Sequence, residues 1–531
     1  MSQVITLPEV SSFTEVNSSV PARTPLRSAL LFAAPFAAAI FLIHLFSSLW
    51  GMHLGYGYFR DDMYFLICGR HLAWGYVDLA PMVALQARLA ESLFGTSPTG
   101  VRIFSFAAHG VTVLLTGLLT RQFGGRRPAQ ALAMCAVIVA PVLLGTGNFL
   151  TMNSFEPCFW MGSLLVLLRI ADGSAPPRAW LLFGLIAGLG IENKHSTVFF
   201  LIALVAGLLF TRQRRLLASW YCAAGIGVLI LVALPNLLWQ WTHHFPTYEF
   251  LHNIGQSDKN LRRQPILFIY EQIKVLLFST APIWIGGIIW LAFSVRSRAW
   301  RFVAVTYLIF LPMMIAMNAK HYYLAPIYPV LFAAGAVGLS QISRRESWIT
   351  IYAVIIGFAI VFTGPITLTI IPPEHYNALT KPFYPDSVRM EKYTSPLPQI
   401  LSDRFGWPQM VQGFADRYNA LPPDVRSKTG IFCSNYGEAS AVNIYGPALG
   451  LPPAISAHVN YFFWGWNNYS GESMLTLGND PADYKEDYDE VIDLGPFDAQ
   501  WSMDYEHRHY FLLRHRKHPY ADDWQSLKKW D

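Results

Sequence analysis

The sequence predicts a mostly α-helical membrane protein, a polytopic helix bundle followed by a small outward-facing α/β domain. Three observations support this prediction. The 531 residues are 53% hydrophobic and only 14% charged, whereas soluble domains carry about 25% charged residues. Apolar runs long enough to cross a bilayer recur over the first 371 residues. The residues that follow are instead rich in Pro, Asp, Tyr and Trp.

Hydropathy divides the chain into three parts. Residues 1–27 are polar and are expected to form a disordered cytoplasmic N-terminus, and residues 28–371 a membrane domain of about eleven helices. The run 28–50 is too long for a signal-peptide core and has no small-residue cleavage site, so we expect it to remain as an anchor. The expected spans are 28–50, 100–120, 129–147, 150–170, 179–193, 196–210, 216–240, 266–293, 302–318, 322–341 and 348–371.

Arginine-rich connections alternate with these spans and predict the orientation by the positive-inside rule. The connections predicted to be cytoplasmic contain Arg23, Arg27, Arg121, Arg126, Arg127, Arg169, Arg178, Arg212, Arg214, Arg215, Arg296, Arg298, Arg301, Arg344 and Arg345. The opposite connections, which include 51–99, 241–265 and the tail from 372, are then periplasmic or extracellular. Lys259, Arg262 and Arg263 are cationic exceptions on that outer side, for which an anionic lipid headgroup is one explanation.

The tail, residues 372–531, has the size of an ordinary domain. Residues 429–434, 490–494 and 509–513 are predicted to form strands, and residues 438–445 a helix. The five cysteines are scattered without metal-ligand spacing, so we expect packing residues and no disulfide framework. The net charge of +5 comes from short loops between spans and does not indicate a nucleic-acid partner.

An acidic pair, Asp61 and Asp62, follows the first apolar run. A carboxylate beside the membrane can act as a general base, bind a metal ion or cap a helix. A general base has to reach the proton that it removes, and burial raises the pKa of such a group toward the working pH. Both residues are therefore candidate catalytic residues, and an N-cap in a solvated loop is the alternative.

Two polar clusters lie at the outer ends of neighbouring spans. Asn153 and Glu156 are three residues apart and share one face of a helix. Polar groups inside a membrane usually face the protein interior, and helix packing is their alternative role. Glu192, Lys194 and His195 lie between two apolar runs and can present a cation to a phosphate. A hairpin turn with a snorkelling lysine is the alternative there.

A third polar cluster, Lys320, His321, Tyr322 and Tyr323, stands at the outer start of another span. A lysine at the start of a helix suits a phosphate group, and an aromatic belt with an anchoring lysine is the alternative. No Walker loop, GxGxxG, GxSxG or HExxH motif is present in the sequence. The outer side of a membrane lacks nucleotides, so an enzyme that works there needs a lipid-linked donor.

These motifs resemble those of the family 39 glycosyltransferases of GT-C fold, which include the protein O-mannosyltransferases and the lipid A aminoarabinose transferases. The resemblance covers residues 50–345. The family's Asp-Glu-x-x-Tyr loop is similar to residues 61–64, one position shorter and with Asp62 in place of Glu, while Asn153 stands where many members have Asp. The family's lysine, tyrosine and proline pattern is matched by Lys320, Tyr323, Leu324, Pro326, Tyr328 and Pro329. The tail of the bacterial members is similar to residues 436–439, 450–453 and 464–465.

The resemblance implies a membrane glycosyltransferase that moves a hexosyl or pentosyl group, with inversion, from a polyprenyl-phosphate donor to a hydroxyl of a lipid, glycan or protein. It implies a site on the outer face of the bacterial inner membrane, with Asp61, and Asp62 beside it, in the role of the base. The candidate donor-phosphate residues are then Lys320, His321, Tyr323, Lys194 and His195, and the candidates for contacting the acceptor or for supporting the residues around it are Asn153, Glu156 and Glu192. A magnesium or manganese ion shared by Asp61, Asp62, Glu156 and His195 is an open alternative.

A transporter or flippase of a lipid-linked or anionic substrate is the alternative function, and a non-catalytic assembly or receptor protein is a third. Transporters place polar sites near the membrane midplane and often contain internal repeats. Here the polar clusters gather at one mouth, a large outer domain follows, and no repeat is visible. The sequence therefore favours the transferase.

Overall fold

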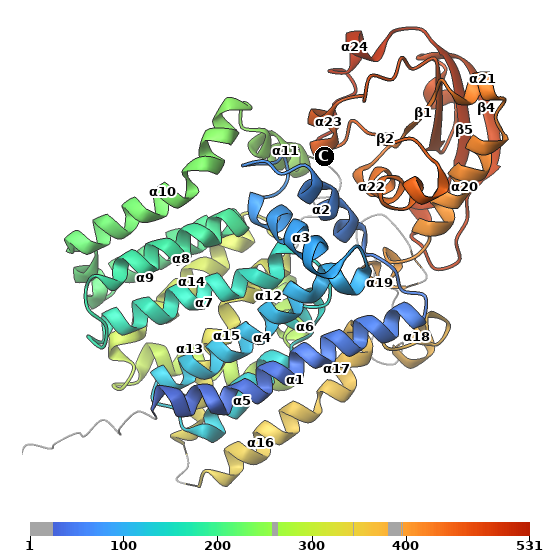
Figure 1. Cartoon of the computed structure of the whole chain (residues 1–531). Helices are drawn as coiled ribbons and strands as arrows, with labels where there is room; N and C mark the ends of the chain where they lie inside the picture. The colour runs from blue at the N-terminus through green and yellow to red at the C-terminus, as the bar shows by residue number, and fades with distance from the viewer. Residues whose placement is uncertain (1–24, 257–263, 343–344, 381–394, 396) are drawn as a thin grey trace, which may run out of the picture.

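Long apolar helices form a bundle, and the C-terminal domain lies at one end of it (Figure 1). The computed structural model describes residues 25–256, 264–342, 345–380, 395 and 397–531. The predicted disordered segment, apart from its last three residues, lies outside the described residues, as do the cationic residues Lys259, Arg262 and Arg263. The chain is a multi-pass membrane protein, as its composition predicted.

Within the part of the chain that the structure describes, seven helices are long and apolar enough to cross a membrane. They are Leu26–His53 (α1), Pro98–Gln122 (α4), Met152–Ala171 (α7), Trp220–Thr242 (α10), Arg298–Ala316 (ending in α14, Arg301–Ala316), His321–Ser340 (η4, His321–Ile327, and α15, Tyr328–Ser340) and Ser347–Thr367 (α16, Ser347–Phe358, and α17, Ile360–Thr367). Two bent pairs raise the number to nine if each is one span. These are Ser196–Leu209 (α9) with Arg212–Ala218 (η1), and Pro265–Val275 (α12) with Phe278–Phe293, which contains α13 (Ala281–Phe293).

Two shorter apolar helices, Arg127–Val139 (α5) and Ala179–Asn193 (α8), occupy two further expected spans. Every expected span therefore contains an apolar helix, whereas the criterion of length supports seven to nine crossings among the described residues. The shortfall has a physical reason. A helix needs about 20 residues to cross a bilayer, but α5 ends at Val139 and is followed by the separate short helix Pro141–Thr146 (α6).

Glycines bring some of these helices into backbone contact. A Cβ atom on Gly184 of α8 would lie 2.0 Å from the carbonyl oxygen of Gly225 in α10, and one on Gly335 of α15 would lie 1.7 Å from that of Ile283 in α13. Small residues let membrane helices approach closely. No hydrophobic effect drives helices together within a bilayer, so the dispersion contacts between the close backbones stabilise their association instead.

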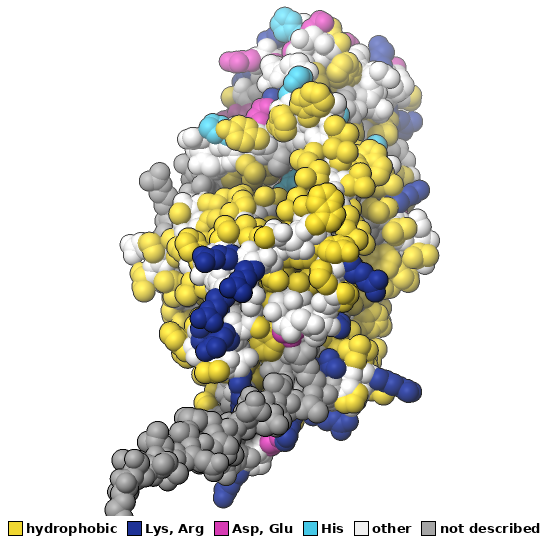
Figure 2. All heavy atoms as spheres, turned by 90° about the vertical axis from the view of Figure 1, so that its left-hand side faces the viewer, with side chains coloured by type: hydrophobic (Ala, Val, Ile, Leu, Met, Phe, Trp, Pro, Cys, Tyr) yellow, Lys and Arg dark blue, Asp and Glu magenta, His cyan; other side chains and the backbone are white. Residues whose placement is uncertain are grey.

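The cationic connections lie together at the end of the bundle opposite the C-terminal domain. Arg126 forms an ion pair of 2.7 Å with Glu346, and Arg127 donates to the Ser28 hydroxyl, so the starts of α1, α5 and α16 meet there. In Figure 2 apolar side chains cover the middle of one face, and most of the Lys and Arg side chains in view lie in its lower half. This separation is the pattern that the positive-inside rule describes.

Three amphipathic helices lie between the bundle and the C-terminal domain in Figure 1: Arg60–Arg70 (α2), Pro81–Phe94 (α3) and Pro246–Gln256 (α11). The sequence placed all three in outer loops. Met63 and Leu66 of α2 belong to the same buried apolar cluster as Ala439 and Val442 of the C-terminal domain. The domain is therefore packed onto α2.

The C-terminal domain is built on a five-stranded sheet in the order β2-β1-β3-β5-β4. The strands are Thr429–Phe432 (β1), Ala454–Ile455 (β2), Ser473–Gly478 (β3), Tyr488–Pro496 (β4) and His509–Arg516 (β5). β1 is parallel to β2 and β3, while β5 is antiparallel to β3 and β4. Its helices are Pro373–Thr380 (α18), Gln399–Ser402 (α19), Trp407–Ala420 (α20), Pro423–Arg426 (α21), Tyr436–Tyr445 (α22), Asn460–Trp464 (α23) and Tyr520–Asp523 (α24).

The three predicted strands and the predicted helix of this domain are confirmed. Two strands were missed: β2 has two residues, and β3 is buried along its whole length, so it shows no alternation of polar and apolar side chains. The α/β fold of the tail is thus as expected.

Candidate active site at the mouth of the bundle

Asp62 lies at the start of α2 and is fully buried. Its Oδ2 accepts hydrogen bonds from Nε (2.9 Å) and Nη2 (2.6 Å) of Arg102 in α4 and from the Phe59 N–H (3.0 Å), while its Oδ1 accepts from the Leu150 N–H (2.7 Å). Both oxygens therefore already accept hydrogen bonds from the protein. We infer a structural role for Asp62 from this environment, while the catalytic role that the sequence predicted stays a prediction.

Asp61, one residue earlier, is one-third exposed. Its Oδ1 accepts a hydrogen bond of 2.8 Å from the Tyr436 hydroxyl, and Nε of Arg60 lies 3.8 Å away. Among the described residues, none donates a hydrogen bond to Oδ2. Asp61 is thus oriented through one oxygen and keeps the other for a ligand, which is the geometry that a general base requires.

Tyr436 reaches Asp61 from the C-terminal domain. It is the first residue of α22, which Asn435 caps by accepting from the N–H groups of Gly437 (2.8 Å) and Glu438 (3.0 Å). Its ring packs on that of Tyr64 with centres 4.5 Å apart. A cap and a ring stack therefore fix the position from which the hydroxyl donates.

A second carboxylate near Asp61, that of Asp78, was missed by the sequence reasoning. Its Oδ1 accepts from the Tyr64 hydroxyl (2.7 Å) and from Nδ2 of Asn460 (3.0 Å). Burial raises the pKa of Asp78 to about 7, hydrogen bonds from Tyr64 and Asn460 oppose this, and the Asp61 carboxylate adds to it. The one available signal was a lone acidic residue in an otherwise apolar stretch.

The structure brings two of the predicted polar clusters together. Nζ of Lys194 donates to Oδ1 of Asn153 (2.8 Å) and to Oε2 of Glu156 (3.0 Å), so those two residues share one helix face, as their spacing predicted. The Ser196 hydroxyl donates to the other Glu156 oxygen. Nζ also lies 4.3 Å from the ring centre of Tyr323. A cation here is held by a carboxylate and an aromatic face.

The remaining predicted residues have other surroundings. The side chain of Lys320 is exposed, just before η4, and the His321 carbonyl accepts from Gln272. Nε2 of His195 is hydrogen-bonded to Oδ1 of Asn236 at 3.1 Å, and Glu192 is buried.

Tyr322 connects this cluster to the acidic pair. Its ring centre lies 5.8 Å from Nζ of Lys194. Asp61 and Glu156 are both close enough to act on its hydroxyl electrostatically. The carboxylate of Asp61 and the cation of Lys194 therefore border one region at the mouth of the bundle.

The four residues considered for a divalent cation do not converge. Asp62 is bound by Arg102, Glu156 by Lys194 and His195 by Asn236. Across the described ranges, no group of three or more His, Cys, Asp or Glu side chains is arranged to hold a metal ion. The open alternative of a magnesium or manganese ion shared by these four residues therefore finds no support among the described residues.

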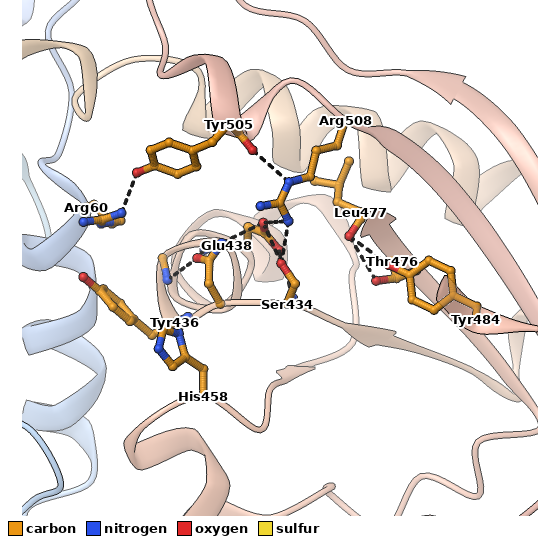
Figure 3. A network of polar contacts seen from close by, with 12 residues as sticks. Arg60, Ser434, Tyr436, Glu438, His458, Thr476, Leu477, Tyr484, Tyr505 and Arg508 are labelled. Atoms are coloured by element: carbon orange, nitrogen blue, oxygen red, sulfur yellow. Dashed lines mark hydrogen bonds and ion pairs between the residues drawn. The ribbon is translucent and has the colours of Figure 1, made fainter. Parts of the chain in front are cut away.

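The side chain of Arg60 also reaches the C-terminal domain, where it faces Tyr505 (Figure 3). It donates to the Tyr505 hydroxyl, which in turn donates to Oδ1 of Asp403 (3.1 Å). Beside it, Nη1 of Arg508 donates to the Ser434 hydroxyl (2.6 Å) and to Glu438 (3.2 Å). Burial and the nearby Glu438 carboxylate raise the pKa of Glu506 well above its usual value, while the Arg508 and Arg60 cations oppose this rise. This polar network fixes the domain on α2.

Sequence comparisons locate relatives of part of the chain. Residues 78–239 match the family model described as dolichyl-phosphate-mannose-protein mannosyltransferase. An undecaprenyl phosphate-alpha-4-amino-4-deoxy-L-arabinose arabinosyl transferase of Pseudomonas paraeruginosa (strain DSM 24068 / PA7) is 34% identical over 155 residues, 28% of each chain. One from Pseudomonas fluorescens (strain Pf0-1) is 26% identical over 168 residues, 30% of this chain and 29% of that protein. The match therefore spans less than a third of these curated relatives.

The fold comparison extends over nearly the whole chain. The crystal structure of ArnT from Cupriavidus metallidurans bound to undecaprenyl phosphate aligns with a TM-score of 0.59 and 14% identity, and covers 90% of this chain and 97% of that one. The apo crystal structure of the same protein gives the same TM-score and covers 91% and 98%. At this identity the likeness is one of fold. It shows the GT-C fold that the motifs indicated, and over residues 78–239 the sequence matches support the similarity of the chain to the family 39 glycosyltransferases.

Proposed function

We propose that this protein transfers a sugar from a polyprenyl-phosphate donor to a hydroxyl group of an acceptor, at the membrane face where the C-terminal domain lies. The names of the curated relatives support a polyprenyl-phosphate sugar as donor. The cationic connections at the opposite end support a periplasmic site in a bacterial inner membrane. The acceptor belongs to the class of lipid, glycan or protein hydroxyls.

The observation that carries the proposal is the oriented, partly exposed carboxylate of Asp61. Asp61 accepts the proton of the acceptor hydroxyl as that oxygen attacks the anomeric carbon. The bond from this carbon to the donor phosphate breaks at the same time, so the sugar configuration inverts and polyprenyl phosphate leaves. The Tyr436 hydroxyl stabilises the carboxylate and aims its other oxygen at the acceptor.

The leaving phosphate needs fixed cations close to where its charge develops. Lys320 is exposed before η4, and Lys194 is held over the ring of Tyr323 by Glu156 and Asn153. We assign Lys320 and Lys194 to the phosphate, and Tyr323 to holding Lys194. Glu156 and Asn153 then position a cation, instead of contacting the acceptor.

The test is transfer of labelled sugar from a panel of polyprenyl-phosphate donors in membranes that contain wild type or Asp61→Asn at matched expression. Asp489→Asn, an exposed residue of β4, is the matched control. We expect wild type and the control to transfer and Asp61→Asn to lose activity. Full activity of Asp61→Asn would refute the base assignment. Absent transfer together with flux of a lipid-linked substrate would favour the transporter.

A further inference from the structure

Val459 has a backbone conformation that a β-branched residue rarely adopts. Its φ is 41° and its ψ is −123°, a region that only glycine enters without strain. Such strain persists only where the surrounding structure determines the conformation, and it gathers at functional sites.

The two neighbours of Val459 both reach the candidate site. Nδ1 of His458 accepts a hydrogen bond of 3.3 Å from the Tyr436 N–H, and the two rings lie 5.2 Å apart. Nδ2 of Asn460 donates to Asp78 (3.0 Å) and to the Tyr64 hydroxyl, while its Oδ1 accepts from the Val77 N–H. A change of backbone direction at Val459 would therefore withdraw partners from both Tyr436 and Asp78.

A short segment, Lys528–Trp530, which we call the strap, holds both sides of Val459. The Val459 N–H donates to the Lys529 carbonyl (3.0 Å), and Nε1 of Trp530 donates to the Val459 carbonyl (3.3 Å). The Lys529 N–H donates to the Ala457 carbonyl (3.0 Å), so the strap runs beside residues 457–459.

The strap also contacts α11, next to the membrane bundle. Nζ of Lys528 lies 2.6 Å from Oε1 of Glu249, and Nδ2 of Asn253 donates to the Trp530 carbonyl (2.8 Å). One segment thus joins an outer helix of the bundle to the strained residue of the C-terminal domain.

We propose that the strap is a positioning element of the active site. By holding Val459 in its left-handed conformation it keeps His458 against Tyr436 and Asn460 against Asp78, and through Tyr436 it orients Asp61. Its residues touch no reacting atom. The proposal rests on the proposed function, because it assigns a role in the same site.

The test pairs Trp530→Phe, which removes the indole donor together with part of the ring, with Val459→Gly, which adopts the observed φ without strain. We expect Trp530→Phe to lower kcat about threefold or more, with KM for the donor little changed. The double variant should recover much of this loss, because glycine enters this conformation without strain and so depends less on the strap. Trp524→Phe is the matched control, because its indole also donates to a backbone carbonyl of this domain, that of Phe462 (3.0 Å).

Hydrogen exchange gives a readout that does not depend on transfer. Amides of residues 457–462 should exchange faster in Trp530→Phe than in wild type or in Trp524→Phe. If no variant transfers sugar, the proposed function fails while the exchange result still decides whether the strap holds Val459. Equal kcat in Trp530→Phe and Trp524→Phe, no recovery in the double variant, or unchanged exchange would each overturn the proposal.

Discussion

The hydroxyl of Tyr436 donates a hydrogen bond of 2.8 Å to Oδ1 of Asp61, across 375 positions of sequence. One partner lies on α2, beside the membrane, and the other at the capped start of α22. The candidate base is thus oriented by a different domain from the one that carries it.

Tyr436→Phe removes this hydrogen bond and keeps the ring stack on Tyr64. Hydrogen bonds to charged groups contribute about 1.5–3 kcal/mol, so we expect kcat to fall about tenfold to hundredfold. Initial transfer rates at saturating donor measure this. Tyr469→Phe loses a hydroxyl contact to the Pro453 carbonyl at the domain surface and serves as the control. Equal rates in the two variants would show that the bond to Asp61 does not matter.

Arg102→Met should destabilise the fold, because it leaves the carboxylate of Asp62 buried without its cation. Breaking a buried pair from one side costs about 3–5 kcal/mol, whereas replacing both partners costs far less. Thermal unfolding in detergent should therefore show a large loss for Arg102→Met and a smaller one when Asp62→Leu is added. A double variant that is worse than either single variant would argue against the structural role of Asp62.

The raised pKa of Asp78 predicts that the stability of the folded protein depends on pH. Its pKa is about 7 in the folded protein and near 3.8 when unperturbed. Between these values the folded state binds more protons, so stability is present at low pH and is lost as the pH rises, by up to about 1.4 kcal/mol per pH unit.

Asp78→Asn keeps an oxygen for the Tyr64 hydroxyl and cannot ionise, so it removes this loss. We expect its unfolding temperature to gain on that of wild type as the pH rises from about 4 to 7. Parallel unfolding curves over this range would contradict the assignment of the raised pKa to Asp78.

Substitutions of Lys320 and Lys194 should separate effects on sugar transfer from effects on stability. Lys320 is exposed, so Lys320→Met should leave the unfolding temperature unchanged and lower kcat/KM about 100-fold through the lost phosphate contact. Lys194→Met should lower both the unfolding temperature and kcat/KM, because the Glu156 side chain is only 1% exposed and loses its cation. Kinetics and thermal unfolding on the same preparations measure these effects. An unfolding temperature of Lys320→Met below that of wild type, or an unfolding temperature of Lys194→Met equal to that of wild type, would contradict these assignments.

The sequence predicted the bundle well, because a membrane span is apolar in itself and needs no knowledge of its neighbours. The position of Asp61 followed from a local motif in the same way. The partners of the acidic residues, Tyr436 and Asn460, could not be predicted in this way. They lie in another domain, and the contact of that domain with α2 leaves no local pattern in the sequence. Asp62 was assigned to catalysis because its cation, Arg102, lay hidden inside a predicted span.

The distance in sequence between Asp61 and Tyr436 also sets an order in time. A ribosome delivers α2 to the membrane long before it has made α22, so a chain whose bundle is already inserted still holds Asp61 without its donor. In the proposed function, the base therefore reaches its full effect only after the C-terminal domain has been made and has packed on α2.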